Sequence, residues 1–210
     1  MMDLFIKGGP VMYPLLACSI LALTVMIERF LFWIREDLRR DQTLVDNVLE
    51  LCRLGNWEEV RKQVQGSMDY VVRILVSGIL HREFSMGKAM ETAAADEIQR
   101  MRRYLIILDT MITVAPLLGI FGTVTGIIAS FELLGTAGIQ NPQAVTAGIA
   151  QALITTATGL AIAIPSVFAY NHFNARAERA ALAVEKYATS LEIVYDKLAQ
   201  ERCTLGEARS

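Results

Sequence analysis

Two long stretches of the 210-residue chain lack charged side chains. No Lys, Arg, Asp, Glu or His occurs within residues 110–131 or within residues 145–170. Each stretch is long enough to cross a hydrocarbon core, which requires about 20 predominantly apolar residues in a helix. A third apolar stretch, residues 11–34, is interrupted only by Glu28 and Arg29. This clustering argues against a water-soluble domain and predicts three transmembrane helices.

Other absences exclude further classes of protein. The three cysteines, Cys18, Cys52 and Cys203, form no CxxC pair, so neither a disulfide framework nor a metal site is predicted. The sequence contains no nucleophile–base set and no nucleotide-binding loop, so we expect no enzyme activity and no cofactor. Basic residues are interspersed with acidic ones, which argues against a nucleic-acid partner. No basic stretch precedes residues 11–34 and no small-x-small cleavage site follows, so a retained span is favoured over a signal peptide.

The distribution of basic residues predicts the orientation. Of the 20 Lys and Arg, 12 lie between Arg35 and Arg103 and 6 lie from Arg176 onward, whereas residues 132–144 have none. Short segments rich in Lys and Arg stay on the cytoplasmic side, and segments without them cross the membrane. The N-terminus is therefore predicted outside and the C-terminus in the cytoplasm.

The predicted fold is all-α, an integral membrane protein whose long helices extend into a cytoplasmic helical domain. Its parts are an outer lead-in (1–10), the first transmembrane helix (11–34), the cytoplasmic helical domain (35–104), the second transmembrane helix (105–134), an outer loop (135–144), the third transmembrane helix (145–173) and a cytoplasmic C-terminal helix and tail (174–210).

Four helical segments are predicted within the cytoplasmic domain. Either Asp41 or Thr43 caps the first, which Gly55 ends, and residues 57–64 and 70–81 form the next two. Ser85 caps a fourth, which should continue without a break into the second span. The third span should likewise run on through the helical pattern of residues 174–202.

Small and polar residues form a stripe along the second span. At about 100° per residue, one helix face is small or polar for most of its length and carries Asp109, Ile112, Pro116, Gly119, Thr123, Gly126 and Ser130. Gly122 and Gly126 have the GxxxG spacing that lets helix backbones approach closely. Spans that present hydroxyls and glycines in this way are typical of helix–helix contacts or of a polar path.

On the third span, Gln151, Thr155 and Thr158 cluster on one face, and Thr156 lies roughly 140° away from Gln151. Gly159 favours close packing, and Pro165 removes a backbone hydrogen bond and should kink or loosen the helix. Two interpretations stay open for each of these polar groups, a structural role and a role in ion conduction. In a structural role, a Thr bonds the carbonyl four residues earlier in its own helix, and Gln151 hydrogen-bonds a neighbouring helix.

The spans contain no carboxylate at mid-membrane. Asp109 is either an interfacial cap or a cytoplasmic ion exit, and it lies about 21 Å along the helix from Thr123. If ions cross, the essential carboxylate must therefore come from another subunit.

Residues 115–126 (APLLGIFGTVTG) and 148–165 (GIAQALITTATGLAIAIP) resemble the MotA/TolQ/ExbB proton-channel family, the ExbB branch in particular. The resemblance implies a ring-forming homo-oligomer, a pentamer, in the bacterial inner membrane, with a periplasmic N-terminus. It implies an ExbD-like single-span partner that carries the membrane Asp, and a TonB-like energy transducer that uses the work.

The resemblance also implies that Thr123 and Thr156 line the ion path. Relatives often carry Glu at the position of Gln151, which cannot titrate, so a proton-relay role there is in doubt. The ion, H⁺ or Na⁺, and the number of partner helices stay open. The alternatives are a TolQ-like or motility stator subunit of the same family and a non-conducting membrane scaffold.

Overall fold

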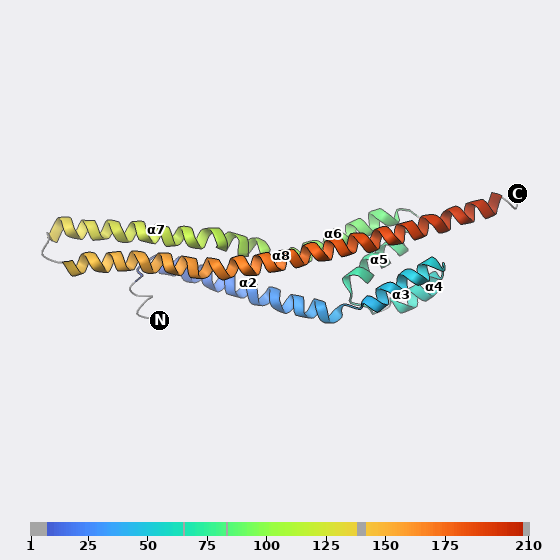
Figure 1. Cartoon of the computed structure of the whole chain (residues 1–210), viewed down its shortest axis with the longest axis horizontal. Helices are drawn as coiled ribbons and strands as arrows, with labels where there is room; N and C mark the ends of the chain where they lie inside the picture. The colour runs from blue at the N-terminus through green and yellow to red at the C-terminus, as the bar shows by residue number, and fades with distance from the viewer. Residues whose placement is uncertain (1–7, 65, 83, 138–141, 208–210) are drawn as a thin grey trace. The chain divides into compact units, whose positions relative to one another are not determined.

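We describe the protein from a computed structural model, which covers residues 8–64, 66–82, 84–137 and 142–207. The described secondary structure is helical throughout, as predicted (Figure 1). Its helices are α2 (Met12–Arg39), α3 (Gln42–Arg53), α4 (Trp57–Gln63), α5 (Tyr70–Leu80), α6 (Met86–Arg102), α7 (Leu105–Ala137) and α8 (Pro142–Glu207). The predicted lead-in falls largely on residues 1–7, which lie outside the described residues.

Three helical stretches are long and apolar enough to cross a membrane, which confirms the predicted number of spans. They are Met12–Arg39, Met86–Glu132 and Thr146–Leu198, and the most apolar 18-residue window of each has a mean hydropathy of 2.0, 2.0 and 1.8 respectively. The apolar part of the second stretch is α7, because α6 is rich in charged residues. The chain is therefore a multi-pass membrane protein.

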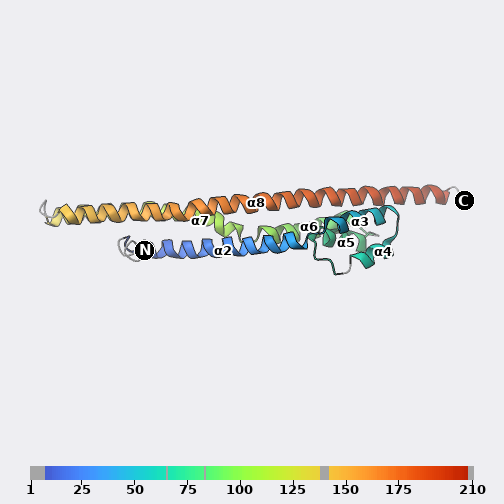
Figure 2. The same ribbon diagram turned by 60° about the horizontal axis from the view of Figure 1, so that its bottom comes forward.

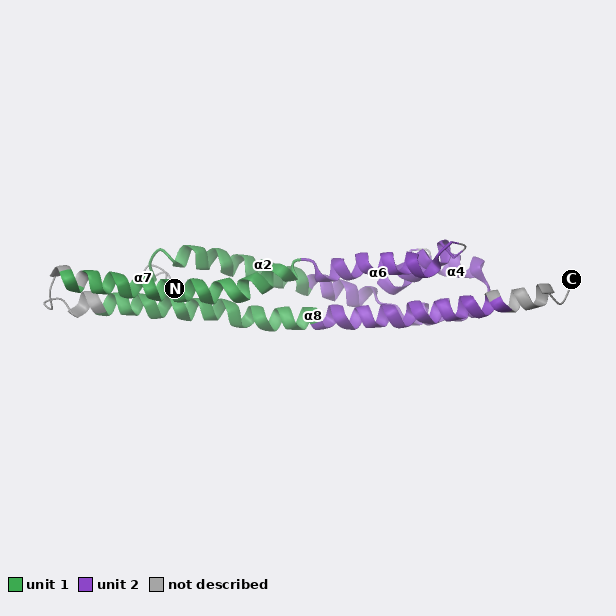
Figure 3. Ribbon diagram, turned by 90° about the horizontal axis from the view of Figure 1, so that it is seen from above, with its two compact units in different colours: residues 1–30, 104–174 green, residues 31–103, 175–210 purple. Residues whose placement is uncertain are grey.

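The chain forms two compact units (Figure 3). Unit 1 comprises residues 1–30 and 104–174, and unit 2 comprises residues 31–103 and 175–210. Unit 1 combines most of the residues predicted to lie in the membrane. Unit 2 combines most of those predicted to lie in the cytoplasm.

Side-chain caps explain where the short helices of unit 2 begin. The Asp41 side chain accepts a hydrogen bond from the Leu44 amide over 3.0 Å, so Asp41 and not Thr43 caps α3. Asn56 caps α4 and Asp69 caps α5 in the same manner. Ser85 stands at the start of α6, as predicted, although its side chain makes no cap hydrogen bond. Such bonds satisfy amide groups that the first turn leaves unpaired.

The predicted continuous helix from Ser85 into the second span is wrong. Helix α6 ends at Arg102, and Tyr104 has a φ of 65°, in the left-handed region that interrupts a right-handed helix. The side chain of Tyr104 faces Arg29, whose guanidinium carbon lies 5.6 Å from the ring centroid. Local propensity favours a helix here, since neither Gly nor Pro is present, and the break therefore reflects tertiary contacts.

Helix α8 continues from the third span into unit 2 as one helix of 66 residues, which confirms the predicted extension (Figure 2). Pro165 lies inside this helix. The bend expected at Pro165 stays a prediction. Helical backbone also occupies both ends of the stretch predicted as the outer loop, because α7 runs to Ala137 and α8 begins at Pro142.

Candidate ion pathway

Each apolar span buries one stripe of side chains within unit 1, at spacings of three and four residues. On α2 the stripe is Leu15, Cys18, Ala22, Val25 and Arg29; on α7 it is Leu105, Leu108, Met111, Ala115, Gly119, Gly122, Gly126 and Ser130; on α8 it is Ala152, Thr155, Gly159, Ala163 and Ser166. Large apolar side chains on the other faces are exposed, as expected for surfaces that meet lipid or another subunit.

Helices α7 and α8 run side by side and contact one another through glycines (Figure 1). A Cβ added to Gly119 would lie 3.0 Å from the backbone oxygen of Thr155, and one added to Gly126 would lie 3.0 Å from that of Gly148. From α8, a Cβ on Gly159 would lie 2.5 Å from the backbone oxygen of Ala115. Such close backbone approach is what small residues permit in membrane helices.

Two adjacent threonines of α8 direct their hydroxyls at one carbonyl of α7. Thr156 Oγ1 donates to the Gly119 oxygen over 3.1 Å, and Thr155 Oγ1 lies 3.4 Å from the same atom. Thr155 also donates to Ala152 within its own helix over 2.8 Å, and it is fully buried. Thr156 is only half-buried. Thr155 is therefore part of the helix contact, whereas Thr156 retains an exposed side.

Thr123 lies one turn beyond Gly119 on α7 and is also half-buried. Its hydroxyl donates to the Ile120 carbonyl over 2.5 Å. Thr158 on α8 donates to Ile154 in its own helix over 2.8 Å. These backbone bonds orient the hydroxyls, and the remaining lone pairs of each oxygen can still accept a hydrogen bond. Gly119 thus lies next to both threonines that the resemblance assigns to the ion path.

Gln151 lies one turn before Thr155 on α8, and its side chain is close to Gly9, which precedes α2. A Cβ placed on Gly9 would overlap the Gln151 amide, which would then have to shift. Gly9 has a φ of 72°, a conformation that also favours glycine. The structure therefore gives Gln151 a contact partner that its sequence position did not predict.

Asp109 is exposed near the opposite end of α7 from the outer loop. The structure does not bring it to Thr123 or Thr156. Within the described residues, no group of three or more His, Cys, Asp or Glu side chains could hold a metal ion.

A buried arginine interrupts the apolar part of α2. Arg29 is 2% exposed, and its Nη2 donates to Glu28 over 2.6 Å. Its guanidinium also lies over the Tyr104 ring. The neighbouring Glu28 and Arg29 form an ion pair. Sequence reasoning missed the contact with Tyr104, because a cation–π contact between residues far apart leaves no periodic signal.

Two further hydroxyls are buried: Ser130, which the sequence places on the polar stripe of the second span, and Ser166, which sequence reasoning did not name. Ser130 donates to Gly126 over 2.9 Å, and a Cβ on Gly148 would overlap its hydroxyl. Ser166 donates to Ile162 over 2.8 Å, one residue after Pro165. Both lie on the buried stripes, and the same helical spacing that identified Ser130 could have found Ser166.

Comparison with known proteins identifies the family. The model of the MotA/TolQ/ExbB proton channel family matches residues 67–186, more than half of the chain and all of α7. The chain belongs to this family. Proton channel subunits of this family are not enzymes, in agreement with the prediction from sequence.

Two relatives of this chain carry ExbB-like names. The putative biopolymer transport protein ExbB-like 3 of Synechocystis sp. is 34% identical over 195 residues, 90% of this chain and 91% of the relative. ExbB-like 1 of the same organism is 40% identical over 171 residues, 78% of this chain and 66% of the relative. The Tol-Pal system protein TolQ of Pseudomonas aeruginosa is 44% identical over 93 residues, 44% of this chain and 40% of TolQ.

Proposed function

We propose that this chain is an ExbB-like subunit of an ion-driven motor in the bacterial inner membrane. With an ExbD-like partner, it converts the proton motive force into mechanical work on a TonB-like protein for outer-membrane transport. Membership of the proton channel family and the ExbB-like names of two relatives support this proposal. So does the lack of any charged residue within 110–131 and 145–170, because a partner must then supply the carboxylate that carries the ion.

In this proposal the chain assembles as a pentameric ring around the partner's membrane helices. The N-terminus is periplasmic and the C-terminus cytoplasmic, as the distribution of Lys and Arg supports. The exposed apolar faces of α2, α7 and α8 contact lipid and neighbouring subunits.

Within the ring, Thr123 and Thr156 line the ion path. The observation that carries this assignment is that Thr156 is tied to Gly119 by its hydroxyl and yet remains half-buried, with its oxygen held in place beside the helix contact. Thr155 and the glycines Gly119, Gly122, Gly126 and Gly159 hold the two helices together. Gln151 contributes a polar group toward the outer end of the third span and Thr158 one near its middle, and Asp109 stands where ions leave to the cytoplasm.

The energetics suit such a transducer. One charge moving down 100 mV releases about 2.3 kcal/mol, so a few ions suffice for a mechanical step. A charged Asp at the centre of a membrane costs about 2.5–3.5 kcal/mol on insertion scales. Hydroxyls at fixed positions on α7 and α8 reduce that cost, because they hydrogen-bond the carboxylate without first having to be ordered.

The proposal is tested by ion flux in proteoliposomes that contain this chain and the ExbD-like protein encoded beside it. We expect flux with the intact partner and none with a partner whose membrane Asp is changed to Asn. Separate H⁺ and Na⁺ gradients identify the ion. Equal flux with both partners would refute the proposed division of labour between the two chains.

A non-conducting scaffold is the second candidate. It is favoured by the backbone bonds that satisfy the hydroxyls of Thr155 and Thr156, as a purely structural contact requires. It predicts no flux from a fully assembled complex.

A TolQ-like or motility stator would conduct ions as well, and the similarity to TolQ supports that alternative. Growth assays on outer-membrane transport, envelope integrity and motility in a deletion strain distinguish these three uses.

A further inference from the structure

Unit 2 contains a buried carboxyl group on α2. Glu36 belongs to the part of α2 that lies in unit 2, and it follows the predicted first span, residues 11–34. The residue is 5% exposed, and its Oε1 is buried without a hydrogen-bond partner within the described residues. It forms no ion pair with any of those residues either. A buried carboxylate without an ion pair is costly, and taking up a proton removes that cost.

Four charged groups of unit 2 act on this carboxyl group. Arg39 is on the same helix, Arg73 is on α5, and Glu97 and Arg100 are on α6. The two arginines of α5 and α6 both pair with Glu97: Arg73 Nη2 lies 2.8 Å and Arg100 Nη1 lies 3.7 Å from its Oε2. Glu97 therefore neutralises the positive charges that would otherwise stabilise an ionised Glu36.

The remaining titratable side chains near Glu36 do not pair with it either. Those that line one cavity with it, contributed by α2, α5, α8 and the residue after α2, are Asp37, Arg40, Tyr70, Arg176 and Arg179. Arg176 donates to Asp37, and Arg40 bonds the Tyr70 hydroxyl. Arg179 donates through Nε to the Ala175 carbonyl over 3.2 Å and is exposed.

Burial decides the protonation of Glu36. Desolvation raises the pKa of its carboxyl above the ordinary value of 4.5, and the opposing effect of Arg73 and Arg100 does not offset this rise. The folded chain therefore favours the neutral acid. The stability that neutral Glu36 contributes is fully present below pH 4.5 and is lost as pH rises through the raised pKa. A proton needs no open pocket, because buried groups exchange with water through local openings.

Residues 31–39 of α2 contact both helices that carry these charges. Arg100 of α6 lies over the Phe32 ring, with its guanidinium carbon 5.8 Å from the ring centroid. Arg40, directly after α2, bonds the hydroxyl of Tyr70 on α5. The charge on the buried carboxyl therefore acts where three helices meet.

We propose that Glu36 is a proton-binding site of unit 2, and that residues 31–39 pack more firmly against α5 and α6 when it is protonated than when it is ionised. Proton binding removes a buried negative charge, and with it the cost of keeping that charge out of water. A fall in pH next to unit 2 thus tightens the packing of this unit. The site is independent of ion conduction, because none of its residues lies on the proposed pathway.

Trp33 reports on this site in the purified full-length chain. The chain has two tryptophans, so Trp57→Phe leaves Trp33, three residues before Glu36 and about one helical turn away. Its fluorescence emission, which responds to nearby charge, is recorded in detergent between about pH 4 and 8. We expect one transition with a midpoint above pH 4.5, and we expect Glu36→Gln to abolish it. No transition, or one that persists in Glu36→Gln, would overturn the proposal.

Thermal unfolding gives the sign of the effect. Glutamine resembles the neutral acid in size and cannot ionise, so Glu36→Gln and the unaltered chain should unfold at similar temperatures near pH 4.5. At about pH 8 the variant should unfold at the higher temperature, because the unaltered chain then carries the buried charge. The opposite order at about pH 8 would show that ionised Glu36 stabilises unit 2, and would overturn the proposal.

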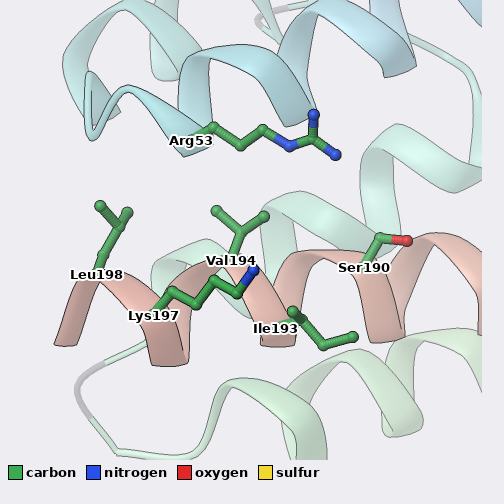
Figure 4. Close-up of a pocket in the computed structure, with 6 residues that line it drawn as sticks. All are labelled: Arg53, Ser190, Ile193, Val194, Lys197 and Leu198. Carbon is green, nitrogen blue, oxygen red and sulfur yellow. The ribbon is translucent and has the colours of Figure 1, made fainter. Parts of the chain in front are cut away.

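Two further variants test which charges act on the site. Arg73→Gln removes a positive charge that lowers the pKa of Glu36, so the midpoint should move to higher pH, and Glu97→Gln should move it to lower pH. Arg53→Gln is the matched control, since Arg53 lines a different cavity, between α3 and α8, and is not among the charges that act on Glu36 (Figure 4). Equal midpoints in Arg73→Gln and Arg53→Gln would assign the titration to another group. Arg73→Gln retains Glu36, so this comparison decides the matter if Glu36→Gln fails to fold.

Discussion

Thr156 on α8 donates its hydroxyl to the carbonyl oxygen of Gly119 on α7 over 3.1 Å. Its neighbour Thr155 points to the same carbonyl but is fully buried, whereas Thr156 is half-buried. Two threonines next to each other in sequence therefore differ in what they can contact outside the chain. From this difference we propose that Thr155 serves helix packing and that Thr156 contacts the ion or the partner.

The contact between α7 and α8 should be sensitive to a single methyl group at Gly159. Gly159→Ala would place Cβ 2.5 Å from the Ala115 carbonyl oxygen, so the helices must separate. We expect a loss of about 1–3 kcal/mol, measured as a lower midpoint of thermal unfolding in detergent. Gly135→Ala is the control, because nothing lies within 4 Å of its new Cβ. Equal midpoints for the two variants would show that the helices are not in close contact at Gly159.

The left-handed backbone at Tyr104 predicts that a glycine variant is more stable than an alanine variant at this position. Glycine normally destabilises a helix relative to alanine by about 1 kcal/mol. At a φ of 65° the order is reversed, because a Cβ in the left-handed region costs about 1–2 kcal/mol. Tyr104→Gly should therefore unfold at a higher temperature than Tyr104→Ala, and Tyr104→Phe, which keeps the ring over Arg29, should resemble the unaltered chain. If Tyr104→Ala were the more stable of the small variants, α6 and α7 would form one helix.

Much of the fold follows from local sequence. Charge-free runs locate α7 and the first part of α8, and Asp41 and Ser85 stand where α3 and α6 begin. The break at Tyr104 could not be predicted, because the sequence around it favours a helix and the contact with Arg29 comes from residues distant in the chain.

The candidate site was predictable only in part. Helical spacing identified the small residues on α7, and the structure places Gly119, Gly122 and Gly126 against α8. Spacing could not tell Thr155 from Thr156, since adjacent residues differ by about 100° and the buried direction depends on where α7 lies.

Cys52 on α3 should be an unreactive thiol in the folded protein. It is fully buried, and burial raises the pKa of its thiol from 9.0 to about 12. At pH 8 its thiolate fraction is then about a thousandfold smaller than that of a thiol with a pKa of 9. In a Cys18→Ser, Cys203→Ser variant, we expect iodoacetamide to label Cys52 rapidly only after unfolding in denaturant. Rapid labelling of the folded chain at pH 8 would contradict its burial.

The same pKa determines a loss of stability at high pH. Because the folded state favours the neutral thiol, the stability that buried Cys52 contributes to the folded chain is fully present below pH 9 and is lost as pH rises toward 12. Cys52→Ala lacks this titration. The difference in unfolding midpoint between the two chains should therefore be constant up to about pH 9 and shrink at higher pH.

The most direct test of the proposed pathway is proton flux per assembled complex for Thr156→Ser, Thr156→Val and Thr155→Val, each with the ExbD-like partner. Serine keeps the hydroxyl and valine keeps the shape, so the account predicts near-normal flux for Thr156→Ser and a loss of about tenfold or more for Thr156→Val. Thr155→Val should reduce the yield of assembled complex while each complex formed conducts normally. Flux equal to that of the unaltered chain in a fully assembled Thr156→Val complex would contradict a role for this hydroxyl in conduction.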